Sequence, residues 1–156
     1  MRVDELLAGL FERAGFRGTY APEEDGSFIL ASDGITVAFR EVQDYPMQGV
    51  TSLLVCGRLG TLPLEGAEGT VRRLVRANAN RDELGGCTLS VCDDDIYLQR
   101  VLMLAALDVD RFEAAFSRFF DTFCTWRDRI SEPCEEEAPV PGEDALSMEM
   151  NGYLRA

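Results

Sequence analysis

The sequence predicts a single α+β domain in which a twisted antiparallel sheet is packed by three helices, followed by an acidic tail. Apolar residues recur at helical spacing in three segments and alternate with polar residues in others. The segments follow the order α-β-β-β-α-β-β-α, without the regular βαβ units of a parallel sheet, so antiparallel pairing is expected. A chain of 156 residues with 46% hydrophobic residues is large enough to bury one core.

The first part of the chain predicts one helix and a β-hairpin. Residues 3–14 carry apolar side chains every three or four positions, which is typical of an amphipathic helix. Alternating apolar residues then predict strands over 27–32 and 35–42. Asp33-Gly34 between them is a favoured two-residue hairpin turn, because both positions need a positive φ.

The middle of the chain predicts a third strand, a second helix and a second hairpin. The strand over 51–58 is apolar on both faces, so we expect both faces to be covered. A helix is predicted over 64–79, and strands are predicted over 87–92 and 96–103. The apolar face of this helix is expected to consist of Ala67, Val71, Leu74 and Val75.

The strongest helical pattern covers residues 109–130. Asp110 and Glu113 stand three residues apart at its start, which predicts a capping box. Periodic aromatic residues usually bury themselves, so we expect the apolar stripe of this helix to belong to the core. The stripe consists of Val109, Phe112, Phe116, Phe119, Phe120, Phe123, Trp126 and Ile130.

Residues 131–156 are expected to form an acidic tail beyond the domain of residues 1–130. This segment holds seven acidic residues, one arginine and three prolines, a composition that argues against a packed element. The whole chain has a net charge of −13, and all its basic residues are arginines. Such a surface repels phosphate backbones, so we expect no nucleic-acid partner.

The N-terminus predicts a cytoplasmic protein. Asp4 and Glu5 interrupt it at once and no apolar run follows, so it does not read as a secretory signal. The sequence has no stretch of 18 or more apolar residues, so no membrane partner or membrane span is expected. The five cysteines are expected to be reduced in the cytoplasm.

Residues that carry chemistry are scarce, and we expect no enzyme, no metal site, no cofactor and no small-molecule substrate. The chain has no histidine, which removes the commonest general base and a frequent metal ligand. Cysteine pairs at zinc-knuckle spacing and glycine motifs for phosphate are also missing. Asp93-Asp94-Asp95 stands between two predicted strands, which favours a solvated turn over a cation site.

Apolar faces are more numerous than the buried places that one protomer offers. Three helix faces and a five-stranded sheet compete for cover, and a face left uncovered must meet a partner. The second predicted helix carries valines beside arginines and is the best candidate for an interface between two copies. The sequence therefore favours a protein-binding function.

Several short motifs stand at defined places along the predicted elements. They are Leu6-Leu7 and Phe11 before Gly15, Leu59-Gly60-x-Leu62-Pro63, Ala77-Asn78, Gly85-Gly86-Cys87-Thr88-Leu89, Asp95-Ile96-Tyr97-Leu98, Leu107-Asp108, and Trp126. In this order they resemble the class I type III secretion chaperones of the Tir chaperone family, over residues 3–130. The chain departs from the family pattern at Asp93-Asp94-Asp95, where a glycine is usual, and in its tail, because the family usually ends soon after the last helix.

The resemblance implies a homodimer and one client. The client would be the extended N-terminal segment of a secreted effector, kept soluble and secretion-competent without ATP. The implied dimer residues are Val71, Leu74 and Val75. The implied client-binding residues are Leu7, Phe11, Phe28, Leu30, Val37, Phe39 and Leu53, with inward and outward members not separable from sequence.

Two alternatives stay open at this point. The chain is alternatively a non-secretory protein-binding or adaptor domain on the same fold. A further hypothesis concerns the apolar end of the tail, residues 145–154, which would occupy the client groove when the groove is empty.

Overall fold

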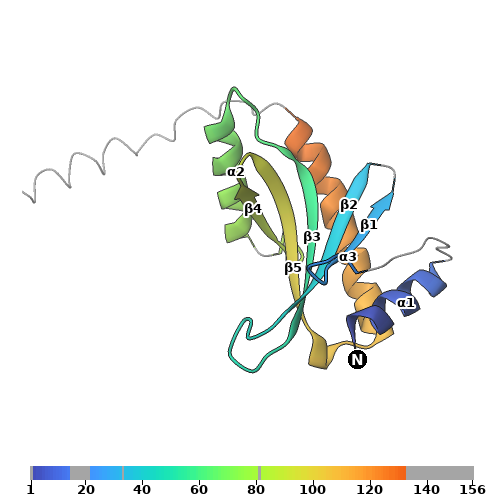
Figure 1. The fold of residues 1–156 in the computed structure, drawn as a ribbon. Helices are drawn as coiled ribbons and strands as arrows, with labels where there is room; N and C mark the ends of the chain where they lie inside the picture. The colour runs from blue at the N-terminus through green and yellow to red at the C-terminus, as the bar shows by residue number, and fades with distance from the viewer. Residues whose placement is uncertain (1, 15–21, 33, 81, 133–156) are drawn as a thin grey trace, which may run out of the picture.

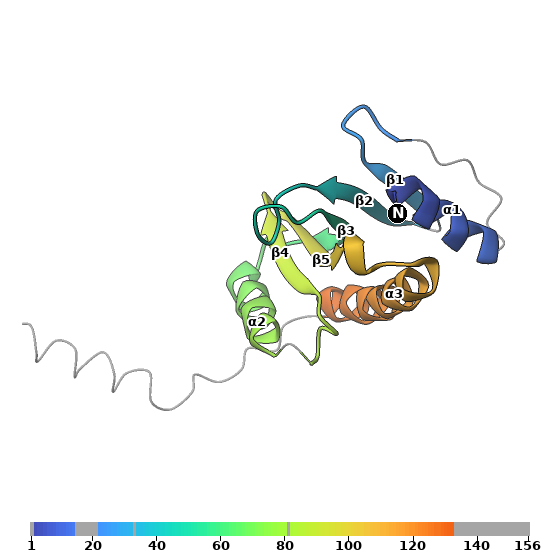
Figure 2. The same cartoon turned by 90° about the horizontal axis from the view of Figure 1, so that it is seen from below.

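The protein folds into two layers, an antiparallel sheet with three helices on one of its faces (Figures 1 and 2). The computed structural model describes residues 2–14, 22–32, 34–80 and 82–132. The element order predicted from the sequence is confirmed. The elements are α1 (Val3–Arg13), β1 (Phe28–Ser32), β2 (Ile35–Val42), β3 (Ser52–Thr61), α2 (Ala67–Ala79), β4 (Thr88–Cys92), β5 (Asp95–Met103), the 3₁₀ turn η1 (Leu104–Ala106) and α3 (Val109–Ser131).

The sheet has five strands in the order β1-β2-β3-β5-β4, and every neighbouring pair is antiparallel. β3 lies at the centre and pairs with β2 on one side and β5 on the other. The register between β3 and β5 shifts between Arg58 and Gly60. β1 and β4 are therefore the two edge strands.

The two faces of the sheet differ in cover. The face toward the helices is buried and includes Val37 and Phe39 of β2, Leu53 and Val55 of β3, and Ile96 and Leu98 of β5. On the opposite face, Leu54 and Cys56 of β3 are only half-buried, and Met103 of β5 is exposed. The expectation that this strand is covered on both faces is wrong for one protomer, because all three helices lie on the same side.

α3 supplies the largest side chains of the core. Phe112, Phe119, Phe123 and Trp126 are buried against the sheet, as the aromatic stripe predicts. The cap of this helix differs from the predicted capping box. Asp108 is the N-cap residue, and its carboxylate accepts a hydrogen bond from the Arg111 backbone N–H at 2.8 Å.

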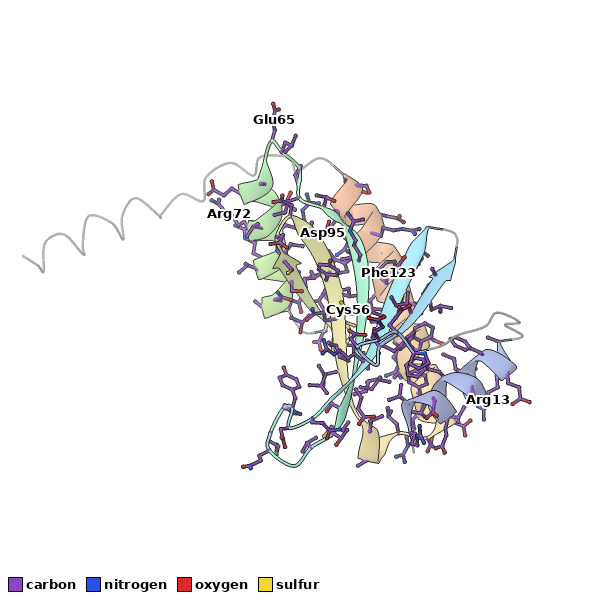
Figure 3. The ribbon with its side chains drawn as sticks, viewed as in Figure 1. Arg13, Cys56, Glu65, Arg72, Asp95 and Phe123 are labelled. Atoms are coloured by element: carbon purple, nitrogen blue, oxygen red, sulfur yellow. The ribbon has the colours of Figure 1, made fainter. Side chains whose placement is uncertain are left out.

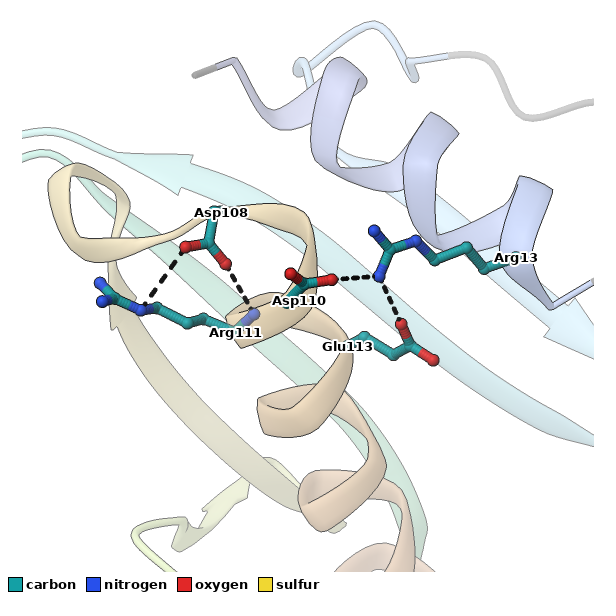
Figure 4. Close-up of polar contacts among 5 residues, drawn as sticks. All are labelled: Arg13, Asp108, Asp110, Arg111 and Glu113. Atoms are coloured by element: carbon teal, nitrogen blue, oxygen red, sulfur yellow. Dashed lines mark hydrogen bonds and ion pairs between the residues drawn. The ribbon is translucent and has the colours of Figure 1, made fainter.

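The predicted cap residues of α3 instead tie this helix to α1. Arg13 Nη1 lies 2.5 Å from Asp110 Oδ1 and 3.0 Å from Glu113 Oε2 (Figure 4). The pair of carboxylates raises the pKa of the Arg13 guanidinium, chiefly through the hydrogen bond with Asp110. Arg13 at the end of α1 thus binds Asp110 and Glu113, the two acids that the sequence pattern assigned to helix capping.

α2 packs beside β4 through a face different from the predicted one. Its buried residues are Thr70, Leu74 and Ala77. Of the predicted face, only Leu74 is buried, whereas Val71 and Val75 are exposed. Each residue turns the helix by about 100°, so the true face lies roughly a fifth of a turn away from the predicted one.

Asn78 fastens the end of α2 to the edge of the sheet. Its side-chain Nδ2 donates to the Leu89 carbonyl at 2.8 Å, and its Oδ1 accepts from the Leu89 N–H at the same distance. The amide therefore replaces the strand that would otherwise pair with β4 at this position.

Among the described residues, no helix is long and apolar enough to cross a membrane.

Candidate protein-binding surfaces

An apolar groove lies where α1, β1 and α3 meet. Its volume is about 350 Å³. Its apolar walls come from Leu10, Phe11 and Ala14 of α1, Leu30 of β1, and Phe116 and Phe120 of α3. This is the shape and lining expected of a pocket that takes apolar side chains.

Partial burial keeps the groove accessible. Phe116 is half-buried, and Phe120 is 36% exposed. The Phe116 ring packs on the Phe39 ring of the sheet, with ring centroids 5.6 Å apart. The core therefore fixes the floor of the groove, while the Phe120 ring remains available to a partner.

The rim of the groove is acidic. Glu113, Ser117 and Asp121 complete its lining. Glu113 also accepts a hydrogen bond from Arg13, so the ion pair that holds α1 on α3 forms part of the rim (Figure 4). Loss of this ion pair would loosen one wall of the groove against the other.

The predicted client-binding residues divide into two groups. Leu30 is half-buried and lines the groove, as does Phe11, although Phe11 is only 5% exposed. Phe28 is half-buried in a second pocket of about 360 Å³ beside Val3 and Pro22. The other four predicted residues fill the core and are not accessible in this protomer. They are Leu7, Val37, Phe39 and Leu53, each at most 1% exposed.

The sequence reasoning missed Leu10, Phe116 and Phe120 as groove residues. All three belong to apolar stripes that were assigned to the core. The available signal was the width of the α3 stripe, because Phe119 and Phe120 are adjacent and must point about 100° apart. One of two adjacent aromatic residues on a helix therefore lies at the border of its buried face.

The second candidate surface is the outer side of α2. Val71 is 38% exposed and Val75 is 62% exposed, whereas Leu74 is 3% exposed and packs inside the protomer. Val71 and Val75 are four residues apart and so form one short strip, called here the valine strip. Arg72 also points outward from this helix (Figure 3).

The side of the sheet without helices forms a third, flatter surface. Cys56 lies on it at the centre of β3 (Figure 3), and burial raises the pKa of its thiol. Burial also raises the pKa of the Cys87 thiol, which faces the core. In the parts of the chain that the structure describes, no group of three Cys, Asp or Glu side chains is placed to hold a metal ion.

Several solved structures of protein complexes share this fold. A chain of the ExsC–ExsE complex matches with a TM-score of 0.67 and 21% identity, over 86% of this chain and 96% of its own length. A chain of the HopA1–SchA chaperone–effector complex matches with a TM-score of 0.60 and 15% identity, over 80% and 92%. A chain of the ExoU–SpcU complex from the type III secretion system of Pseudomonas aeruginosa matches with a TM-score of 0.56 and 19% identity, over 83% and 94%.

Comparison of sequences places the chain in a family. No curated protein sequence matches it significantly. Residues 5–127, from the first turn of α1 to the last turns of α3, match the Tir chaperone protein (CesT) family. Because this match spans most of the chain and every described element, the protein belongs to the Tir chaperone protein (CesT) family.

Proposed function

We propose that this protein is a cytoplasmic, ATP-independent chaperone that binds the extended N-terminal segment of a type III secreted effector. The groove between α1, β1 and α3 carries this proposal, because it places the exposed Phe120 and the half-buried Phe116 beside an edge strand. Family membership and the shared fold of secretion chaperone complexes support it. The bound effector would stay soluble and secretion-competent.

An extended client suits the groove for a physical reason. A peptide that adds a strand to an edge gains backbone hydrogen bonds, and its alternate side chains enter neighbouring pockets. β1 offers the edge, and Leu30 of β1 lies in the groove wall. Ile29 projects to the opposite face and is exposed there, so a client on β1 meets apolar surface on both sides.

One groove alone gives limited affinity. Burial of a single Leu or Phe side chain contributes about 1.5–3 kcal/mol. Ordering a disordered segment costs about 2–5 kcal/mol, so one anchor barely offsets that cost. The client must therefore contact several sites, which include the mixed polar and apolar pocket beside Phe28 and the second groove of a homodimer.

The valine strip on α2 is the proposed contact between the two copies. Val71 and Val75 would meet their counterparts, and Leu74 would support the helix from within the protomer. Of the three dimer residues implied by the resemblance, Val71 and Val75 would therefore be contact residues and Leu74 a core residue. Two copies joined at α2 would carry their grooves on the far sides of the assembly, since α1 and α2 lie at opposite ends of the sheet (Figure 2).

Co-expression with a candidate effector tests the proposal. The probe is the N-terminal 100 or so residues of a secreted protein encoded beside this chain, with F120D as the groove variant and M47D as the control. Met47 is exposed in the loop between β2 and β3, away from the groove and from α2. We expect the wild-type chain and M47D to retain the effector segment in the soluble fraction and F120D to lose it. Equal retention by F120D, or no binding of any secreted segment by the wild-type chain, would rule the proposal out.

A further inference from the structure

The outer surface of α2 is divided lengthwise into a basic part and an apolar part. With about 100° between successive residues, Arg73, Arg76 and Arg72 follow one another from the α3 side toward the solvent. The valine strip lies next around the helix, on the side of Asn78 and β4. The basic part is called here the arginine flank and consists of Arg72, Arg73 and Arg76.

The chain leaves α3 beside the arginine flank. Arg73 Nη1 donates to the Arg129 carbonyl at 2.7 Å, and Nη2 lies 3.4 Å from the Glu132 carbonyl. Arg73 thus binds carbonyl groups at the C-terminal end of α3. The same guanidinium marks the place from which residues 133–156 begin.

The segment that follows is strongly acidic. Glu135, Glu136 and Glu137 begin three residues after Glu132. Three residues of extended chain span at most about 10 Å, so these carboxylates are within reach of all three arginines of the flank. On α2 itself the only acid is Glu68, which pairs with Arg72 at 3.0 Å in an exposed position.

We propose that the acidic segment Glu135–Glu137 binds the arginine flank of α2 in the same chain. Exposed ion pairs are weak one by one, but several acids that converge on several arginines form a network with a common ordering cost. The attraction must also be sensitive to salt, because the screening length falls from about 10 Å at 0.1 M to about 3 Å at 1 M. The contact would direct the tail along α2 and leave the valine strip uncovered.

The alternative destination of the tail is the client groove. Its nearest wall residue, Phe120, lies 11 residues before Ser131, about 17 Å back along the α3 axis. The tail is long enough to reach it. However, the rim of the groove carries Glu113 and Asp121, which repel an acidic chain, so charge favours the arginine flank.

NMR of the full-length chain tests the contact directly. The test variant is E135Q/E136Q/E137Q, and E143Q/D144N is the matched control with acids removed farther along the same tail. The readouts are the arginine Nε–Hε signals and backbone amides of α2, and those of Leu10 and Phe120 in the groove. All substitutions lie outside the folded elements, and sedimentation confirms that every sample has the same association state.

We expect the triple variant to shift the signals of Arg72 and Arg76 and the control to leave them in place. Addition of 0.5 M NaCl to the wild-type chain should reproduce most of the shift. Unchanged α2 signals in the triple variant, or shifts that appear at Leu10 and Phe120 instead, would overturn the proposal. The measurement uses no effector, so its failure would leave the chaperone proposal standing.

Discussion

The ring of Phe123 lies directly on the backbone of Gly57, at the centre of the sheet. A Cβ atom at Gly57 would stand 2.6 Å from Phe123 Cε2 and 2.7 Å from Phe123 Cδ2. Real Cβ atoms essentially never approach so closely, so β3 and α3 pack at this distance only because residue 57 has no side chain. Phe123 is itself fully buried (Figure 3 marks its place on α3).

The substitution G57A should destabilise the fold. Overpacking of a well-filled core typically costs about 1–3 kcal/mol, because side chains must leave their preferred rotamers. Urea unfolding measures the loss as a lower midpoint. G60A is the control on the same strand, since a Cβ there would meet only Ile130 Cγ2 at 3.7 Å, an ordinary contact. Equal midpoints for G57A and the wild-type chain would contradict this account of the contact.

Removal of the Asn78 amide should weaken the attachment of α2 to β4. N78A leaves both backbone groups of Leu89 without their recorded partner in a part-buried position. An unsatisfied buried polar group costs about 1–3 kcal/mol, so we expect a loss of this size and faster hydrogen exchange in β4. N80A is the control, because Asn80 makes only a long, exposed bond of 3.4 Å to Glu83. If the Leu89 amide exchanged no faster in N78A, the two hydrogen bonds from Asn78 would not be what holds α2 on β4.

Charges placed on the valine strip should separate the proposed dimer. Aspartate at Val71 and Val75 would bury carboxylates in an apolar contact, which is costly without partners. For V71D/V75D we expect at least a tenfold rise in the dimer dissociation constant, about 1.4 kcal/mol, by analytical ultracentrifugation. The control is I29D, which adds a charge to the exposed face of the opposite edge strand. A wild-type chain that sediments as a monomer at micromolar concentration would remove the proposed interface.

The ion pair between β3 and β5 should give stability a defined dependence on pH. Arg58 Nη2 lies 2.7 Å from Asp95 Oδ1, and this hydrogen bond is the main cause that lowers the pKa of Asp95 below its ordinary value of 3.8. A carboxyl whose pKa is lower in the folded state stabilises the fold above its unfolded pKa. That contribution is lost as the pH falls through the folded pKa.

We therefore expect D95N to be less stable than the wild-type chain at pH 6, and we expect this difference to shrink as the pH falls below the ordinary value of 3.8 toward the lower folded pKa of Asp95. Chemical unfolding at a series of pH values measures this difference. D94N in the same turn is the matched control. A difference between D95N and wild type that stayed constant from pH 6 to pH 3 would show that the charge of Asp95 plays no part.

The element order could be predicted because periodicity alone determines it. The start of α2 could not, because it depends on Gly66. This residue adopts a φ of 78°, and α2 begins only at Ala67, after the exposed Leu64. The predicted start at residue 64 placed the helix directly after Pro63. The left-handed backbone of Gly66 cannot be predicted from the spacing of apolar residues.

The cap of α3 shows a different limit. Asp108 and Asp110 flank Val109, the first residue of the apolar stripe, and local rules favoured the pair Asp110 and Glu113. Arg13, some hundred residues earlier in the chain, binds that pair and leaves the capping role to Asp108. Long-range contacts of this kind decide between local patterns that are equally acceptable.

The candidate site was predicted in part for a related reason. Phe28, Leu30, Val37 and Phe39 lie on one face of the hairpin, because Phe28 pairs with Phe39 and Leu30 with Val37. Strand alternation gives this common face but not its direction. Only the position of α3 shows that the face turns inward, with the edge strand β1 remaining near enough to the surface for Leu30 to reach the groove.

The two borders of the sheet are not equivalent. The clamp from α2 occupies the border at β4, while on β1 the described residues add only a bridge from Pro22 to Phe28. Among the described residues, an added strand can therefore pair with the sheet at the β1 edge but not at Leu89 on the β4 edge. On the proposed function, this difference would let each copy accept one extended client at β1. The occupied edge at β4 would stop identical copies from pairing edge to edge into continuous sheets, a hazard that two open edges would create.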